Sequence, residues 1–292
     1  MRKEKLARDY FLGVDDDLQE VMVQADSMIN KPLDQRISPI RSWWPHFDKM
    51  TLGYIPGKLY VLGGRPGDGK TSAATTQTAN IIRSSNQSVL YISTELTPLE
   101  IVLQVGEAFC GGIATAPKGD RLTAQEEARL REAHIEIGQA ITDRRLSIVH
   151  AKKLTEKFII DAIEHHCHIL NNDLISLVII DQVNRVERNN TWGNYAIATE
   201  GLLNSIEEAA SDCHVPILLL SQLGRGRDQR DKPSMGDFKH SGGLEEYAHC
   251  AILLHRGEGM EAEIIVAKNR SGNVGAIPAR FIGQSHYWEE IS

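Results

Sequence analysis

The sequence predicts an α/β domain in which helices flank a mainly parallel central sheet and antiparallel strands extend that sheet at its C-terminal edge. Three observations support this prediction. Apolar runs of strand length alternate with helical segments through most of the chain. A glycine-rich stretch joins one of these runs to a helix. The last three apolar runs follow one another with only turns between them, which is typical of antiparallel strands.

The N-terminal part is predicted to be a separate segment, residues 1–45, in front of a main domain, residues 46–292. Residues 16–30 are expected to form a helix whose apolar positions share one face: Leu18, Val21, Met22, Ala25, Met28 and Ile29. Such a helix must bury its apolar stripe, either on its own domain or on a neighbouring subunit. Residues 31–57 are rich in proline and are expected to be mostly loop. Within them, Trp43 and Trp44 can either stack on a base or lie in the core, and the core is favoured.

The strands and helices of the main domain follow from apolar runs and helix-start signals. The expected strands are residues 59–62, 88–93, 146–150, 174–181, 215–222, 251–255, 263–267 and 277–282. A helix is expected after the glycine-rich stretch, and further helices over residues 155–169 and 195–210. Thr97 to Glu100 and Thr123 to Glu126 each fit a capping box, in which Thr and Glu side chains satisfy free backbone N–H groups, so a helix is expected after each Thr.

The composition is that of an ordinary globular protein. The chain has 292 residues, 41% hydrophobic and 24% charged, and a formal net charge of −7. This charge argues against a uniformly basic nucleic-acid binder but is compatible with a local basic lining, as in a ring or channel. Neither a membrane span nor a signal peptide is expected. The four cysteines are scattered, which indicates reduced thiols in a cytoplasmic protein.

The glycine-rich stretch has the pattern of a phosphate-binding loop. Gly64 to Thr71 fits G-x-x-x-x-G-K-[ST], with a strand before it and a helix after it. Glycines let successive N–H groups point at one anion, and the helix N-terminus adds partial positive charge. Lys70 is expected to reach the β- and γ-phosphates of ATP, and Thr71 to hold Mg²⁺. The residues expected around the phosphates are Gly64, Arg65, Pro66, Gly67, Asp68, Gly69, Lys70, Thr71 and Ser72.

Polar residues at the carboxyl ends of the other strands are further candidates, because ligands of open α/β sheets bind there. Asp181 ends the 174–181 strand and is expected to hold Mg²⁺ together with Thr71. Gln182 rather than Glu follows it, so the catalytic carboxylate is sought on another strand. Glu95 fits this role, because it can hold a water in line with the γ-phosphate. Gln222 is expected to sense that phosphate, although each residue singly is equally well explained as a solvated strand end.

The stretch from residue 223 to 243 is long, glycine-rich and locally basic. Its basic residues are Arg225, Arg227, Arg230, Lys232 and Lys239. Placed after a γ-phosphate sensor, such a loop suits a nucleic-acid motor, since its affinity for nucleic acid can change with nucleotide state. A plain solvated loop is the alternative. His165, His166 and His168 lie together on another helix, where a polar helix end is favoured over a zinc site.

These motifs together resemble the motor domain of the DnaB-like replicative DNA helicases, a RecA-like P-loop ATPase family. The resemblance covers about residues 16–290. It rests on the segments GGRPGDGKT, YISTEL, LVIIDQVNRV, VPILLLSQLGR, DFKHSGGLEE and EIIVAKNRSGNVG, which follow the family's order. It implies an ATP hydrolase, usually a homohexameric ring, that moves 5′ to 3′ on single-stranded DNA held in the central channel.

The resemblance also implies roles for particular residues. Residues 16–30 look like the linker helix that docks on the adjacent subunit. Lys239, His240 and Gly242 look like the loop that follows the DNA backbone, and Arg225 is a further basic candidate for DNA contact. Lys268 and Arg270, in KNRSG, look like the pair that reaches into the neighbour's ATP site.

The sequence departs from the family pattern in two ways. Barely fifteen residues precede the linker helix, so the family's N-terminal collar domain, which usually engages primase, is expected to be missing. A helicase loader or a primase therefore remains an open partner. His240 stands where the family commonly has an acid, so the DNA contact is expected to differ in detail.

Two functions remain after the sequence is read. The favoured one is an ATP-driven, ring-shaped replicative helicase or translocase. The alternative is a RecA-like DNA-dependent ATPase that binds DNA, or regulates another helicase, without unwinding. The joint presence of the Lys268 and Arg270 pair, the linker helix and the DNA-loop motif favours the helicase.

Overall fold

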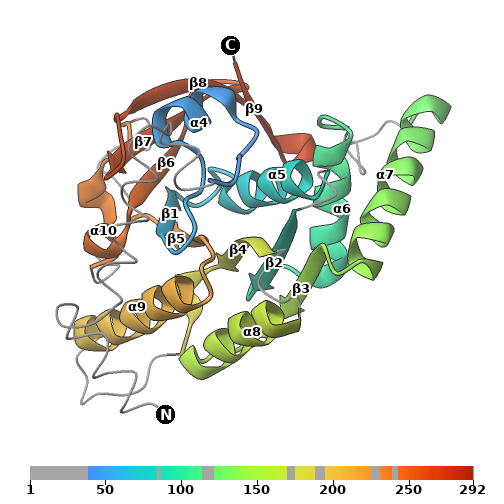
Figure 1. The fold of residues 1–292 in the computed structure, drawn as a ribbon. Coiled ribbons are helices and arrows are strands. Elements are labelled where there is room, and N and C mark those ends of the chain that lie inside the picture. The colour runs from blue at the N-terminus through green and yellow to red at the C-terminus, as the bar shows by residue number, and fades with distance from the viewer. Residues whose placement is uncertain are drawn as a thin grey trace, which may run out of the picture. The chain divides into compact units, whose positions relative to one another are not determined.

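A computed structural model describes the chain over residues 39–83, 87–113, 122–169, 175–187, 195–224, 231–238 and 243–291. The predicted linker helix over residues 16–30 lies outside these ranges. The described residues belong to one compact unit, which starts at Pro39. Figure 1 shows its helices on both sides of a central sheet.

The described strands form one nine-stranded sheet in the order β3-β2-β4-β5-β1-β6-β7-β8-β9. Neighbouring strands from β3 to β6 in this order run parallel, and β7, β8 and β9 pair antiparallel. The strands are β1 Leu59–Gly64, β2 Ser88–Ser93, β3 Leu146–His150, β4 Ile175–Asp181, β5 Ile217–Gln222, β6 Cys250–Arg256, β7 Glu261–Asn269, β8 Gly275–Ile282 and β9 Tyr287–Glu290. The predicted α/β fold is therefore confirmed.

The helices connect the parallel strands and cover both faces of the sheet. They are α4 Pro45–Thr51, α5 Lys70–Ile82, α6 Pro98–Phe109, α7 Ala124–Thr142, α8 Glu156–Ile169, α9 Tyr195–Asp212 and α10 Leu244–Tyr247. The described residues also form the 3₁₀ turns η1 Val183–Arg185, η2 Met235–Phe238 and η3 Gly283–Ser285. Both predicted capping boxes are present, at the start of α6 and at the start of α7.

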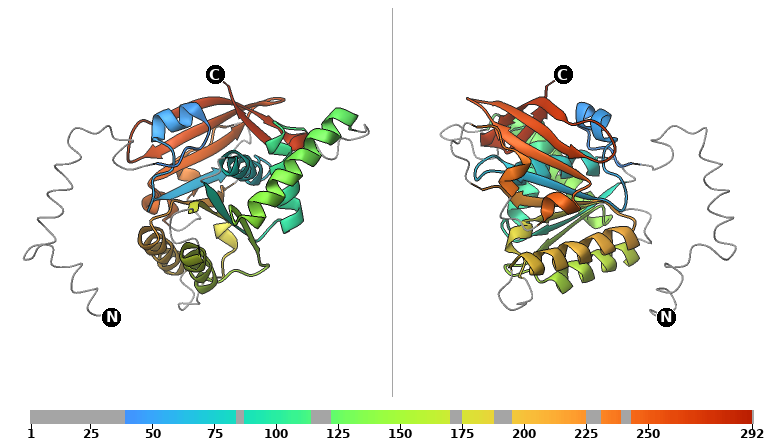
Figure 2. Two further views of the ribbon diagram at one scale, coloured as in Figure 1. Left: turned by 45° about the vertical axis from the view of Figure 1, so that its right-hand side comes forward. Right: turned by 90° about the vertical axis from the view of Figure 1, so that its left-hand side faces the viewer.

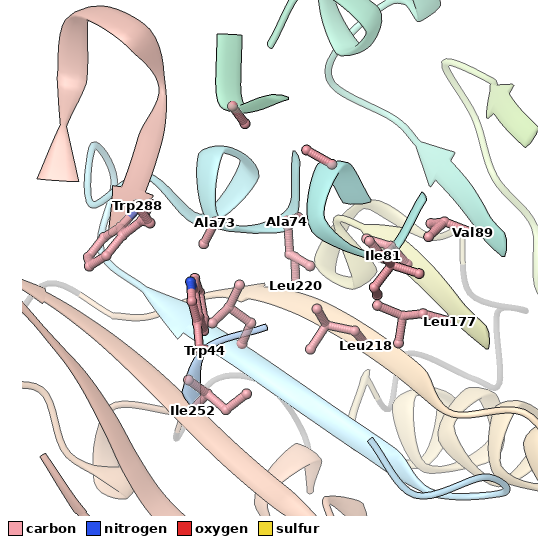
Figure 3. Packing of buried hydrophobic residues seen from close by; sticks show 14 of the residues in the cluster. Trp44, Ala73, Ala74, Ile81, Val89, Leu177, Leu218, Leu220, Ile252 and Trp288 are labelled. Carbon is pink, nitrogen blue, oxygen red and sulfur yellow. The ribbon is translucent and has the colours of Figure 1, made fainter. Parts of the chain in front are cut away.

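Two large hydrophobic clusters hold these layers together, one on each face of the sheet. The first joins the sheet to α5, α6 and α7, and the second joins it to α8 and α9. Figure 2 shows α8 and α9 side by side under the sheet. In Figure 3, Ala73, Ala74 and Ile81 of α5 face the sheet residues Leu218 and Leu220. Because successive side chains of a strand point to opposite faces and helices cover both faces, the middle of β4 must be apolar on both sides, as residues 177–180 are.

The last three predicted strands pair antiparallel with one another, as expected, since β6 pairs with β7 and β7 with β8 in this way. The prediction did not give the direction of β6 relative to the parallel strands. β6 lies parallel to β1, with Tyr60 opposite Cys250. The chain reaches β6 through η2 and α10, and such a crossover returns a strand in the parallel direction. β9 was not predicted.

The structure corrects the expectation of a loop over residues 31–57. The described part of that stretch contains α4, which begins at Pro45. Proline is well tolerated at the first helical position, where its missing N–H has no partner to lose. The prediction for the two tryptophans is half right, because Trp44 is 3% exposed and Trp43 is 52% exposed.

Two expectations from the composition can be compared with the structure. The four cysteines are all free and buried. No helix in the described part of the chain is both long and apolar enough to cross a membrane.

Candidate functional site

The glycine-rich loop lies at the carboxyl edge of the parallel strands, between β1 and α5. β1 ends at Gly64, which is in register with Gln222 at the end of β5. β4 follows β5 in the sheet and ends at Asp181, and β2 follows β4. The predicted site residues of four different strands therefore meet at one edge of the sheet, as expected for parallel strands.

The loop has the backbone geometry that its glycines permit. Gly67 has a φ of +87° and Gly69 a φ of +76°, in a region that other residues rarely adopt. The backbone N–H of Arg65 donates to Asp68 Oδ2 at 2.8 Å, which closes the turn. Helix α5 starts directly after Gly69. The free N–H groups of its first turn and the partial positive charge of its dipole make this end suitable for an anion.

Lys70 lies folded against the loop. Its Nζ donates to the carbonyl oxygen of Gly64 at 3.0 Å and to that of Arg65 at 3.4 Å. Burial lowers the pKa of the Lys70 ammonium, and the nearby carboxylates of Asp181, Asp68 and Glu95 oppose that effect. Its two hydrogen bonds go to neutral carbonyls, so a charged phosphate oxygen would be a stronger hydrogen-bond partner for this ammonium.

Thr71 and Asp181, the two residues predicted to hold Mg²⁺, lie in direct contact. The Thr71 hydroxyl donates to Asp181 Oδ2 at 2.9 Å, and the Tyr91 hydroxyl donates to the same oxygen at 3.0 Å. Asp181 Oδ1 is buried and has no hydrogen-bond partner among the residues that the structure describes. Burial raises the pKa of Asp181 to about 6, and the Thr71 hydrogen bond opposes this rise. A buried carboxylate with an unsatisfied oxygen, next to a hydroxyl, offers the hard oxygen ligands that fit Mg²⁺.

Glu95 lies beside these residues, and two side chains that sequence reasoning missed hold it in place. Gln182 Nε2 donates to Glu95 Oε1 at 2.8 Å, and an Arg185 guanidinium nitrogen lies 2.6 Å from the same oxygen. Both residues follow Asp181 closely in the chain, at the start and the end of the turn η1. Their place next to the strand end was the one signal that could have identified them.

Gln222 ends β5 next to the loop. Its side chain is exposed, and its backbone N–H donates to Asn184 Oδ1 at 3.2 Å. The next backbone N–H, that of Leu223, donates to the Gly64 carbonyl at 3.1 Å. The end of β5 that carries Gln222 is therefore hydrogen-bonded both to the glycine-rich loop and to the turn η1, whose Arg185 contacts Glu95.

Lys268 and Arg270 lie away from this edge, at the end of β7. The Arg270 guanidinium donates to the Glu246 carbonyl at 2.7 Å, and Lys268 Nζ donates to the carbonyls of Glu245 and Glu246. These are carbonyls of α10 in the same chain, where basic side chains are favourable. Arg270 is exposed. The structure brings the two residues together with α10.

The predicted DNA-contact residues Arg225, Lys239, His240 and Gly242 lie outside the described residues. Lys232 of the same stretch is described, and it pairs with Glu263 at 2.7 Å. Within the described ranges, no group of three or more potential metal ligands occurs.

Three further side chains contact the glycine-rich loop from the C-terminal strands. They are Arg256, Phe281 and Trp288. Sequence reasoning did not single them out, since no local pattern connects them with a loop about two hundred residues earlier in the chain.

Comparison with known sequences places this geometry in context. Residues 40–290 match the family described as DnaB-like helicase C terminal domain. Replicative DNA helicase DnaB of Geobacillus stearothermophilus is 25% identical over 290 residues, which cover 93% of this chain and 60% of that protein. Replicative DNA helicase DnaC of Bacillus subtilis (strain 168) is 25% identical over 285 residues, covering 91% of this chain and 60% of that protein. The chain thus spans about three fifths of the length of these relatives.

Two solved structures are similar to this one. The first, solved as an ATPase domain, has a TM-score of 0.82 at 22% identity, and the match covers 96% of this chain and 100% of that one. The second, a DnaB-like replicative helicase solved in a study of its interactions with primase, has a TM-score of 0.79 at 23% identity. That match covers 96% of this chain and 67% of the other. At such identities the likeness shows a shared fold.

Proposed function

This chain belongs to the DnaB-like helicase C-terminal domain family, and from that premise we propose that it is the ATPase motor of a ring-shaped replicative DNA helicase. ATP hydrolysis drives its movement from 5′ to 3′ along single-stranded DNA. The observation that carries the proposal is the convergence, at one sheet edge, of the phosphate loop, the Thr71–Asp181 contact and Glu95. The residues proposed to bind the phosphates, to coordinate Mg²⁺ and to orient the attacking water therefore lie in one site.

The loop residues bind the phosphates of ATP. The glycine backbone and the start of α5 supply N–H donors, and Lys70 exchanges the carbonyls of Gly64 and Arg65 for the β- and γ-phosphates. This exchange is favourable because the lysine then offsets a formal negative charge instead of two neutral carbonyls.

Mg²⁺ fits the pair formed by Thr71 and Asp181. When bound, the ion offsets the charge on the phosphates of the nucleotide. The Thr71 hydroxyl and the Asp181 carboxylate are the side chains that would hold it, and the unpartnered Asp181 Oδ1 supplies a free oxygen. Tyr91, which donates to Asp181 Oδ2, keeps that carboxylate in a single orientation.

Glu95 orients the attacking water. Its contacts with Gln182 and Arg185 both use Oε1, so Oε2 is the oxygen that accepts a hydrogen bond from the water. Gln222 and the loop that follows it connect this site to DNA. We assign phosphate sensing to Gln222 and DNA contact to the basic loop, with Arg225, Lys239, His240 and Gly242 as the contacting residues.

Neighbouring subunits complete the proposed motor. Lys268 and Arg270 reach into the ATP site of the next subunit, and the helix over residues 16–30 docks on that subunit. In this arrangement, the contacts of Lys268 and Arg270 with α10 connect the neighbour's ATP site to the proposed DNA loop, because α10 follows that loop in sequence. A change at the neighbour's phosphates can then reach the DNA loop through α10.

The proposed partners are single-stranded DNA, Mg²⁺ with ATP, and further copies of this chain in a hexameric ring. A primase or a helicase loader is a further proposed partner, since one structural relative was solved in a study of its interactions with primase. We propose that contact for the whole assembly, because this chain spans only about three fifths of the length of the relatives it matches.

The test compares ATP hydrolysis with and without single-stranded DNA, and measures strand displacement on a forked duplex. We expect hydrolysis to rise with DNA, and displacement to require both ATP and a 5′ tail on the fork. Lys70→Ala is the matched control and should abolish both activities. Hydrolysis stimulated by DNA without any displacement, on forks of either polarity, would instead support the DNA-dependent ATPase that does not unwind.

A further inference from the structure

The glycine-rich loop is supported from outside by side chains of the C-terminal strands. Trp288 of β9 is completely buried, and its Nε1–H donates to the carbonyl oxygen of Gly69 at 3.1 Å. Arg256, at the end of β6, donates from a guanidinium nitrogen to the carbonyl oxygen of Gly67 at 2.9 Å. Figure 3 shows Trp288 beside the first turn of α5, near Ala73.

Phe281 of β8 lies between these two side chains. Its ring centroid is 5.2 Å from that of Trp288, with the rings stacked at 30°, and the Arg256 guanidinium lies 4.7 Å from the same ring centroid. Phe281 and Trp288 are opposite each other in the β8–β9 register. Arg256, Phe281 and Trp288 therefore form one continuous stack, here called the brace.

The brace touches the loop backbone closely enough to exclude a side chain there. A Cβ atom at Gly69 would lie 2.7 Å from the Phe281 ring and 2.9 Å from Trp288 Nε1. Glycine at this position therefore serves two needs, the positive φ of the loop and the close approach of the brace. The motif glycine and the distant aromatic pair fit each other.

The strand that carries Trp288 is itself held at both ends. His286, just before β9, contacts Glu107 of α6 at 2.8 Å. Glu290, at the end of β9, accepts the backbone N–H of His46 in α4 at 2.7 Å. Between these ends, the backbone N–H of Trp288 donates to Thr76 Oγ1 of α5 at 3.3 Å. The indole therefore has little freedom to leave the loop.

Holding a carbonyl fixes the orientation of its whole peptide unit. In a trans peptide the N–H points opposite to the C=O, so a donor on Gly69 O directs the N–H of Lys70 to the other side of the loop. Gly69 O also accepts the first helical hydrogen bond, from Ala73 at 2.8 Å, so both of its acceptor positions are used. Arg256 fixes the peptide after Gly67 in the same way.

We propose that Trp288 and Arg256 are positioning residues that hold the carbonyls of Gly69 and Gly67 and so keep the loop in its phosphate-binding shape. This inference rests on the proposed function, because it concerns the affinity of the same loop for a nucleotide. A loop already in the bound shape loses less conformational entropy on binding. The brace therefore sets nucleotide affinity, whereas Glu95 and its partners set the rate of hydrolysis.

The test is the substitution Trp288→Phe. It keeps an aromatic ring stacked against Phe281 but removes the Nε1–H that donates to Gly69. The probe is ADP with Mg²⁺, titrated by calorimetry, together with KM and kcat for ATP. We expect the Kd for ADP and the KM for ATP to rise about fivefold, as for one lost hydrogen bond, with kcat at saturation unchanged. Trp44→Phe is the matched control, since Trp44 is buried in the same core cluster and makes no hydrogen bond to the loop in the described structure. It should lower the midpoint of urea unfolding but leave the Kd unchanged.

Arg256→Ala provides an independent measurement, because Arg256 is exposed at a strand end and its loss leaves the core intact. We expect it to raise the Kd for ADP about threefold. It also decides the question if Trp288→Phe does not fold. Wild-type affinity in both variants would overturn the inference. If the unaltered protein itself did not bind ADP with Mg²⁺, the proposed function would fail instead, so the two failures can be told apart.

Discussion

The burial of Asp181, the proposed Mg²⁺ ligand, predicts that the protein becomes more stable when this carboxylate is removed. The substitution is Asp181→Asn, which keeps the shape of the side chain and removes its charge. Asp181 is fully buried, and desolvation raises its pKa from 3.8 to about 6. Hydrogen bonds from Thr71 and Tyr91 offset only part of the desolvation, because the other carboxylate oxygen, Oδ1, has no partner in the described part of the chain.

The size of the effect follows from this shift. At about 1.4 kcal/mol per pKa unit, the rise from 3.8 to about 6 makes the ionised side chain cost about 3 kcal/mol of folding free energy. Because the folded protein binds the proton more tightly than the unfolded chain, stability falls as the pH rises from 3.8 to about 6 and is constant above that range. Asparagine does not ionise, so the variant does not undergo this loss of folding stability. The variant should gain up to about 3 kcal/mol at pH 8 and about half of that gain at pH 5.

The assay is urea unfolding of both proteins at pH 5 and pH 8, without nucleotide or metal. Asp212→Asn, which removes an exposed carboxylate at the end of α9, is the control for the loss of a negative charge outside the buried site. The stabilised variant should also lose ATP hydrolysis, since the proposed carboxylate ligand of Mg²⁺ is gone. A variant that is less stable than wild type, or whose gain is equal at both pH values, would refute the reasoning.

The remaining predictions concern catalysis, DNA and the helix caps. Glu95→Gln should bind ATP with an affinity close to that of wild type in a filter-binding assay but stop turnover, and normal hydrolysis would exclude Glu95 as the water-orienting residue. Lys239→Ala should weaken single-stranded DNA binding about equally for any sequence and flatten its salt dependence, and an unchanged slope would remove Lys239 from the DNA site. Thr123→Ala should lower the free energy of unfolding by about 1 kcal/mol, because the capping box of α7 is lost, and an unchanged urea midpoint would contradict that role.

Local signals in the sequence predicted the elements that local forces determine. The strand before the phosphate loop, the helix after it and both capped helices occur as expected, because each depends on residues within a few positions of one another. Helix α4 and strand β9 were missed for the opposite reason. β9 has only four residues and is defined by its pairing with β8, and α4 begins at a proline that equally suits a loop.

The candidate site likewise contains some contacts that the sequence could predict and others that it could not. Thr71 and Asp181 could be brought together in advance, because parallel strands end at one edge of a sheet. The contacts of Glu95 with Gln182 and Arg185 could not, because they depend on how the turn η1 directs its side chains. The hydrogen bond from Trp288 to the loop depends on the register of the last strands, which no local pattern records.

The central claim is that this chain works in a ring, with each ATP site completed by the next subunit. It is tested by mixing Arg270→Ala subunits with Glu95→Gln subunits and measuring ATP hydrolysis. Each variant should be inactive alone. In randomly mixed rings, about a quarter of the interfaces pair an intact Glu95 with an intact Arg270, and hydrolysis should return in proportion. If mass measurements show mixed rings and no hydrolysis returns, Arg270 does not act on the neighbouring site and the claim is contradicted.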